Sequence, residues 1–252
     1  MNLSQYLITD PGFYLLAIPA VLILSMSKTG LGSGFGSLAT PLLGMAIAVP
    51  QAAAIMLPVL LVCDLMGQSR LYPHINWRLF KFILPFGLIG TLIGYLLMRR
   101  VAPNTVAGIV GALTLLFLAQ RLAFRASKDK PLPRPIGAVL TATTGFTSFV
   151  AHAGGPPISF YIIPMQLAPL VYTATMGAFF FVINLSKWVP YAALGLFEWK
   201  NFFTSIVLMP LVPFGVWAGM SFASRVRQDT FYNIMYCGMF VAGVKLLYDG
   251  LK

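Results

Sequence analysis

A glycine-rich segment between two apolar stretches carries the strongest chemical signal in the sequence. It runs from Ser27 to Ser37 and has glycine at alternate positions. Each glycine destabilises a helix by about 1 kcal/mol relative to alanine, so a continuous helix is not expected. A broken helix presents unpaired N–H groups and a partial positive charge, which together favour anion binding; the alternative interpretation is close helix packing through small residues. The residues assigned to this predicted anion site are Lys28, Gly30, Gly32, Ser33, Gly34 and Gly36.

A second segment, Ser148 to Pro157, has a similar character and stands at the corresponding place in the second half of the chain. Gly154 and Gly155 supply a bend, and Pro156 suits the first turn of a helix, where a missing N–H costs nothing. We expect the two breaks to face each other near the middle of the protein and assign both glycines to the substrate site. His152 is interpreted either as an anion ligand or proton carrier, or as a hydrogen-bonded structural residue.

Asp64 is the only acidic residue inside a predicted apolar span. A lone carboxylate is costly within a bilayer unless it is paired, hydrated or protonated. Lys187, at a comparable depth in the other half, is the expected partner. Asp64 and Lys187 therefore form either a proton-coupling site or a structural ion pair. Gln68 and Asn184 are candidate hydrogen-bonding residues for the substrate, and Asn184 is equally consistent with a link between helices.

Ten apolar runs position these residues, and two of them are short: Leu38 to Val49 and Pro157 to Leu167. At about 1.5 Å per residue, neither crosses a hydrocarbon core of about 30 Å. Each follows a glycine-rich break, so we interpret them as arms of broken or re-entrant helices. The expected fold is therefore an all-α polytopic membrane protein with about eight full transmembrane helices.

Composition excludes several classes of protein. Of the 252 residues, 58% are hydrophobic and 9% are charged, whereas soluble domains carry roughly 25% charged residues. The net charge is 17 − 6 = +11, but the basic residues lie at the ends of apolar runs, so a nucleic-acid-binding surface is not expected. The sequence has no Walker-type nucleotide-binding motif. One buried acid and one histidine offer little for an intramembrane enzyme, so no catalytic residue is assigned.

The most hydrophilic stretch, Arg121 to Pro135, contains five basic residues and is expected to face the cytoplasm. It separates two similar halves, whose matching residues follow in the same order. The matches are Gly90 and Gly94 with Gly215 and Gly219, Trp77 with Trp199, and Asp64 with Asn184. Loop charges fit two topologies, and we favour an inverted repeat because alternating-access transporters often use it. The predicted units are a first transmembrane repeat (1–122), a basic linker (123–135) and a second repeat (136–252).

These segments resemble the TauE/SafE family of sulfite and organosulfonate exporters, whose halves each open with a glycine-rich segment. Here those segments are Gly30 to Gly36 running on to Pro41, and His152 to Pro157. The resemblance extends over nearly the whole chain through the repeated tryptophan segments and the basic linker. In the first segment, other residues separate the glycines, unlike the consecutive glycines usual in the family. This departure leaves the identity of the substrate open.

The resemblance implies a multi-pass secondary transporter in a bacterial inner membrane that exports sulfite or an organosulfonate, with proton coupling as one open mechanism. An anion channel, or a permease for another carboxylate or oxyanion, is the alternative function; an intramembrane enzyme is the least favoured. No cofactor or metal is expected. The expected partners are a small sulfur anion and membrane lipid, with a homodimer as an open oligomeric state, and nucleic acid is not among them.

Overall fold

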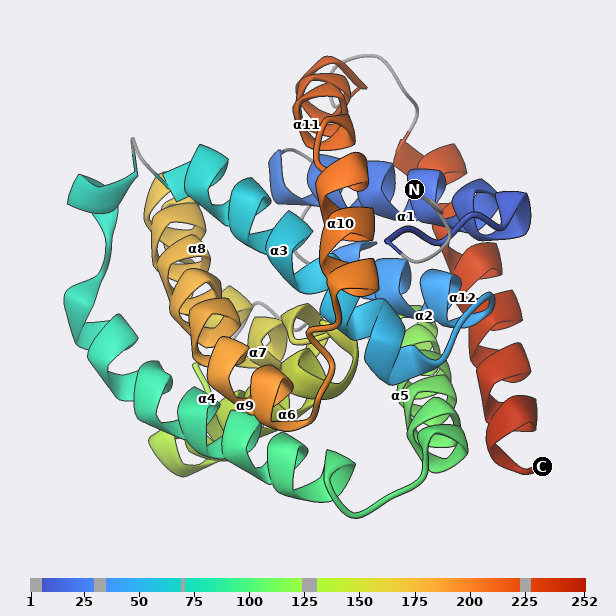
Figure 1. Cartoon of the computed structure of the whole chain (residues 1–252). Coiled ribbons are helices and arrows are strands. Elements are labelled where there is room, and N and C mark those ends of the chain that lie inside the picture. Colours follow the sequence, from blue (N-terminus) through green and yellow to red (C-terminus); the bar gives the residue numbers. More distant parts are fainter. Residues whose placement is uncertain (1–5, 30–34, 69–70, 124–130, 223–227) are drawn as a thin grey trace.

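The computed structural model describes residues 6–29, 35–68, 71–123, 131–222 and 228–252, and within these ranges it is helical and contains no strand (Figure 1). The helices are α1 (Pro11–Thr29), α2 (Ala39–Gly44), α3 (Val49–Gln68), α4 (Trp77–Met98), α5 (Pro103–Ala123), α6 (Arg134–Ala151), α7 (Gly155–Ile162), α8 (Pro169–Ser186), α9 (Trp188–Ala193), α10 (Trp199–Leu208), α11 (Leu211–Phe222) and α12 (Gln228–Gly250), with short 3-10 turns η2 (Phe35–Leu38), η3 (Tyr72–His74) and η4 (Ile163–Met165).

Five of the described helical segments are long and apolar enough to cross a membrane: α1, α3, α4, α5, and α8 continued by α9. A sixth candidate is the pair α10 and α11, which meet at an angle of 44°. The expectation of an all-helical, multi-pass membrane protein is therefore confirmed, whereas about eight full spans are not found among the described residues. Helix α6 falls short of this set because Arg134 and several threonines lower its hydropathy.

The outer and inner faces of α4 differ in the way expected for a helix between lipid and protein. Its exposed face carries large apolar side chains, including Leu92 and Ile93. Its buried face carries Gly87, Gly90 and Gly94, and it packs along α6. A Cβ added at Gly90 would overlap the α6 backbone, so the two backbones lie in direct contact. Small residues are what such close packing requires within a membrane.

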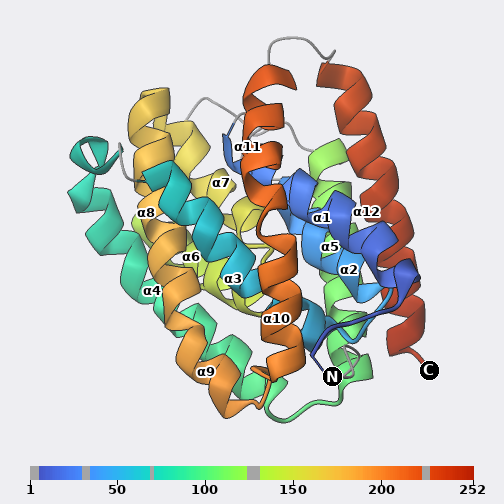
Figure 2. The same ribbon diagram turned by 45° about the horizontal axis from the view of Figure 1, so that its top comes forward.

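The glycine that matches Gly90 in the second half makes a similar contact. Gly215 on α11 faces α1, where an added Cβ would lie 2.6 Å from the Cβ of Ser25. Helices α5 and α12 run antiparallel, since Gly108 lies against Gly250 and Leu115 against Gly243. In Figure 2, α4 and the pair α10–α11 also run in opposite directions. Opposed directions of matching helices favour an inverted repeat. The repeat and its boundaries remain predictions. In the structure, α5 ends at Ala123 and α6 begins at Arg134, close to the two ends of the predicted linker (123–135).

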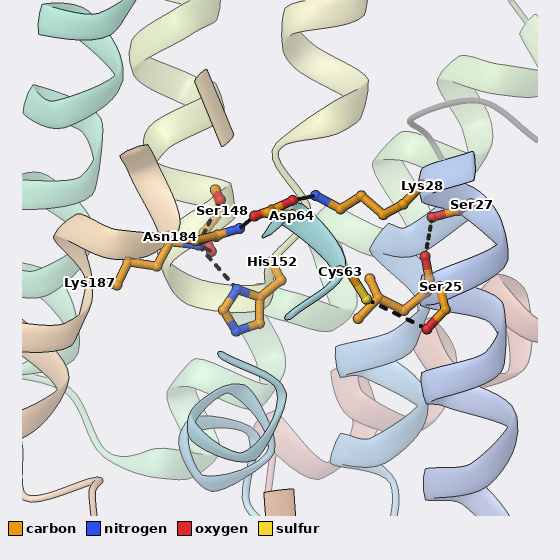
Figure 3. A network of polar contacts seen from close by, with 10 residues as sticks. Ser25, Ser27, Lys28, Cys63, Asp64, Ser148, His152, Asn184 and Lys187 are labelled. Carbon is orange, nitrogen blue, oxygen red and sulfur yellow. Dashed lines mark hydrogen bonds and ion pairs between the residues drawn. The ribbon is translucent and has the colours of Figure 1, made fainter. Parts of the chain in front are cut away.

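The predicted break in the second half is present. Helix α6 ends at Ala151, His152 adopts a left-handed backbone with a φ of 53°, and α7 begins at Gly155 with prolines in its first turn. The corresponding break predicted in the first half stays a prediction, because residues 30–34, between α1 and η2, lie outside the described part of the chain. Lys28, in the last turn of α1, reaches Asp64 of α3, and His152, directly after α6, reaches Lys187 between α8 and α9 (Figure 3).

Candidate functional site

Asp64 lies in the last part of α3 and is almost completely buried, with 3% of its surface exposed. Its Oδ1 accepts a hydrogen bond from Nζ of Lys28 on α1 at 2.5 Å, and its Oδ2 accepts one from Nδ2 of Asn184 on α8 at 2.7 Å (Figure 3). The expectation that Asp64 pairs with Lys187 is therefore corrected. The partner is Lys28, because α1 packs beside α3 and ends at the depth of the carboxylate.

Lys187 stands between α8 and α9 and is completely buried. Its Nζ donates to the carbonyl oxygen of Ser148 at 2.7 Å, to Oγ of the same residue at 2.8 Å, to Oδ1 of Asn184 at 2.9 Å and to Nδ1 of His152 at 3.1 Å. None of these four atoms belongs to a carboxylate. The side-chain amide of Asn184 hydrogen-bonds to both Lys187 and Asp64 and so lies between them.

His152 links the break between α6 and α7 to α3. Its Nε2 lies 2.8 Å from the carbonyl oxygen of Ala53. A carbonyl oxygen can only accept, so Nε2 carries the hydrogen and Nδ1 accepts from Lys187. This assignment follows from the partners of the ring nitrogens. Both nitrogens are therefore occupied, which favours the interpretation of His152 as a hydrogen-bonded structural residue in this arrangement.

Helix α3 receives side-chain donors from the second half of the chain around Pro58. Proline lacks an N–H and interrupts the backbone hydrogen bonding of a helix. Pro58 therefore leaves the carbonyl four residues before it without a backbone donor. The carbonyls directly before and after that one receive side-chain contacts: the carbonyl of Ala53 lies against His152, and the carbonyl of Ile55 accepts from Oγ of Ser205 at 2.8 Å. The second half of the chain thus stabilises the interrupted part of the helix that carries Asp64.

Several contacts of this network could not be predicted from sequence. Ser148, which binds Lys187, lies on the buried side of α6, and Phe180 lies with its ring centroid 5.5 Å from Nζ of Lys28. Beside Asp64, the Sγ of Cys63 lies 3.6 Å from Oγ of Ser25. Serine and phenylalanine are common in these helices, so only the tertiary structure distinguishes these residues from their neighbours.

The glycines assigned to the anion site divide into two groups. In the described part, Gly36 and Gly154 are tightly packed: an added Cβ would lie 2.7 Å from Oγ of Ser27 and 2.9 Å from Cβ of Ser148, respectively. Gly155 is also buried, as the first residue of α7. These contacts fit the packing alternative, and anion binding by the glycines remains a prediction. The assigned residues outside the description are Gly30, Gly32, Ser33, Gly34 and the side chain of Gln68.

We expect His152→Ala to lower the free energy of unfolding by about 1–3 kcal/mol, because it leaves the Ala53 carbonyl without its side-chain donor and Lys187 without one acceptor. Thermal unfolding in detergent measures this change. His74→Ala is the matched control, since His74 is exposed in η3. Equal unfolding temperatures for the two variants would contradict the linking role of His152.

Helices with broad apolar faces, with an ion pair and a buried lysine between them, are typical of multi-pass membrane transporters, in which ionisable groups within the membrane mark substrate and ion pathways. A family model agrees with this class: residues 17–246 match the sulfite exporter TauE/SafE family. The chain therefore belongs to the TauE/SafE family, whose members are transporters and not enzymes. No curated protein and no solved structure matches the chain.

Proposed function

We propose that the protein is a secondary transporter that exports a small sulfur-containing anion, sulfite or an organosulfonate, across a bacterial inner membrane. Family membership supports a sulfur anion as the substrate class. The observation that carries the proposal is Lys187, a fully buried lysine whose hydrogen bonds all go to neutral groups. A buried cation without a contacting carboxylate attracts an anion strongly, because the surrounding low dielectric screens it little.

The proposed energy source is a gradient of an ion or of the substrate itself, since the sequence contains no nucleotide-binding motif. Asp64 is the proposed proton carrier, as an ionisable group between helices from both halves of the chain. Interrupted helices support alternating access: α6 and α7 are separated at His152, and α8 and α9 meet at Lys187. Such interruptions next to buried charges are typical of secondary transporters.

Purified protein in liposomes tests the proposal. We expect uptake of labelled sulfite to saturate with concentration and to be accelerated by unlabelled sulfite on the opposite side. Lys187→Met should reduce this flux about tenfold or more, because it removes the buried cation. The matched control is Lys245→Met, since Lys245 is partly exposed on α12, where it pairs with Asp249. Flux that rises without saturation and shows no counterflow would indicate a channel instead.

A further inference from the structure

Two exposed arginines from different helices neighbour the same aromatic ring near the start of α4. The guanidinium carbon of Arg134, the first residue of α6, lies 5.9 Å from the ring centroid of Phe82 on α4. Arg78 precedes Phe82 by four residues, so the two side chains are neighbours on one face of α4. Lys81, which is also exposed, directly precedes Phe82. Three cations therefore gather where the first turns of α4 and α6 meet.

The two helices bring these cations together because they pack side by side in the same direction. Near their starts, Phe82 of α4 lies beside Arg134 of α6. Near their ends, an added Cβ at Gly94 of α4 would lie 2.8 Å from Cβ of Phe149 of α6. Both helices therefore begin on the same side of the membrane. The basic linker that precedes α6 is expected to face the cytoplasm, so the three cations are expected at the cytoplasmic surface.

None of the three cations pairs with an acidic side chain in the part of the chain that the structure describes. The ion pairs there join Lys28 to Asp64 and Lys245 to Asp249. Like charges on neighbouring turns repel one another, and this repulsion is weakened when an anion binds among them. The cluster is therefore complementary in charge to an anionic group at the membrane surface.

An exposed apolar stripe continues from the cations along the outer face of α4. The exposed residues that follow Lys81 at helical spacing are Pro85, Ile89, Leu92 and Leu96. Tyr72 and Trp77, whose rings are in edge contact, are exposed at the same end as the cations. Aromatic residues are enriched at this level, where the hydrocarbon core meets the headgroups. The stripe thus faces acyl chains, and the cations stand at the level of the headgroups.

We propose that Arg78, Lys81 and Arg134 form a binding site for the headgroup of an anionic phospholipid, whose acyl chains lie along the apolar stripe of α4. The two guanidinium groups suit a phosphate because each can donate two parallel hydrogen bonds to its oxygens. Basic clusters between membrane helices are known to hold such headgroups. A free phosphate ion uses only the cations, whereas a lipid uses the cations and the adjoining stripe. The continuity of the two surfaces therefore favours a lipid.

Titration of the delipidated protein in a neutral detergent with phosphatidylglycerol tests this site. Binding is measured as the rise in unfolding temperature, since a ligand that binds only the folded state raises it. Phosphatidylcholine with the same acyl chains supplies a headgroup without net charge, and glycerol 3-phosphate supplies a phosphate without chains. We expect phosphatidylglycerol to bind about tenfold or more tightly than phosphatidylcholine. Glycerol 3-phosphate should bind more weakly than phosphatidylglycerol, because it lacks the chains that contact α4.

Arg78→Gln and Arg134→Gln should each weaken phosphatidylglycerol binding about fivefold, the factor that one cation near an anionic headgroup contributes. Arg134→Lys should recover only part of the binding, because it keeps the charge but loses the paired hydrogen bonds. The matched control is Arg99→Gln with Arg100→Gln, which removes two exposed cations directly after the end of α4 and should leave binding unchanged. All four arginines are exposed, so these variants are expected to fold.

Equal weakening by the control and by Arg78→Gln with Arg134→Gln would overturn the proposal, because it would indicate general surface charge and not a site. Phosphatidylcholine that binds as tightly as phosphatidylglycerol would contradict the role of the cations. Glycerol 3-phosphate that binds as tightly as the lipid would indicate a site for free phosphate instead. If a variant changes the unfolding temperature without added lipid, native mass spectrometry counts the bound lipid directly, and the same comparisons apply.

Discussion

Asp64→Asn is expected to lower the free energy of unfolding by about 3 kcal/mol, because removing one partner of a buried ion pair leaves the other charge uncompensated. The uncompensated charge is Lys28, whose side chain keeps 25% of its surface exposed. This partial exposure places the expected loss at the lower end of the usual range for buried pairs. Chemical or thermal unfolding in detergent measures the loss.

The double variant Lys28→Met with Asp64→Asn should regain much of this stability, since no unpaired charge then remains at that position. Lys187→Met combined with Asp64→Asn should not, because Lys187 contacts neutral groups and not the carboxylate. This pair of double variants distinguishes the ion pair in the structure from the Asp64–Lys187 pair expected from sequence. Equal recovery by both would show that the partner assignment is wrong.

The same substitution tests proton coupling. Asp64→Asn resembles the protonated carboxyl, so a carrier role predicts that net flux in proteoliposomes loses its dependence on a pH gradient. Exchange of substrate at equal concentrations should continue, because it requires no net movement of protons. The stabilised double variant is measured beside it to separate coupling from loss of fold. A well-folded Asp64→Asn protein whose flux still depends on the pH gradient would exclude Asp64 as the carrier.

Gly145→Ala is expected to destabilise the protein by about 4 kcal/mol or more, in the range of the most damaging single substitutions. A Cβ at this position on α6 would overlap the carbonyl oxygen of Gly87 on α4. The contact is between two backbones, so no side-chain movement relieves it, and the helices must separate. Unfolding temperature and the yield of monodisperse protein in detergent measure the effect.

Gly238→Ala on α12 is the matched control for this substitution. Its added Cβ would lie 3.1 Å from Cδ2 of Leu38, the end of a flexible side chain that needs to move only slightly. We therefore expect a change within about 1 kcal/mol, since substitutions that create no backbone overlap have small effects. Gly145→Ala protein as stable as this control would contradict the direct backbone contact between α4 and α6.

The sequence by itself determined the class of the protein, the position of the described helix break and the family. Hydropathy is a local property, so long apolar runs identify membrane helices whatever their neighbours are. The break at His152 is also local, since Gly154, Gly155 and Pro156 set the end of one helix and the start of the next. The motifs behind the family resemblance are contiguous for the same reason, and the match over residues 17–246 confirms it.

Sequence was less informative about the number of full spans. The described part contains five or six candidate spans, where the apolar runs suggested about eight. The two long runs that are not among the candidates are those of α6 and α12. In α6, Arg134 and several threonines lower the hydropathy averaged over the whole helix, although the apolar run within it is long.

Only the tertiary structure decided which ionisable residues meet. Sequence reasoning selected Lys28, Asp64, His152, Asn184 and Lys187 separately, because each is a rare polar residue within or beside an apolar run. It then paired Asp64 with Lys187, because the two residues were expected to lie at comparable depths in the membrane. In the fold, α1 packs beside α3, so Lys28 reaches the carboxylate first, and Asn184 separates Asp64 from Lys187. Electrostatic pairing depends on distances between helices, and these distances are set by packing and not by position along the chain.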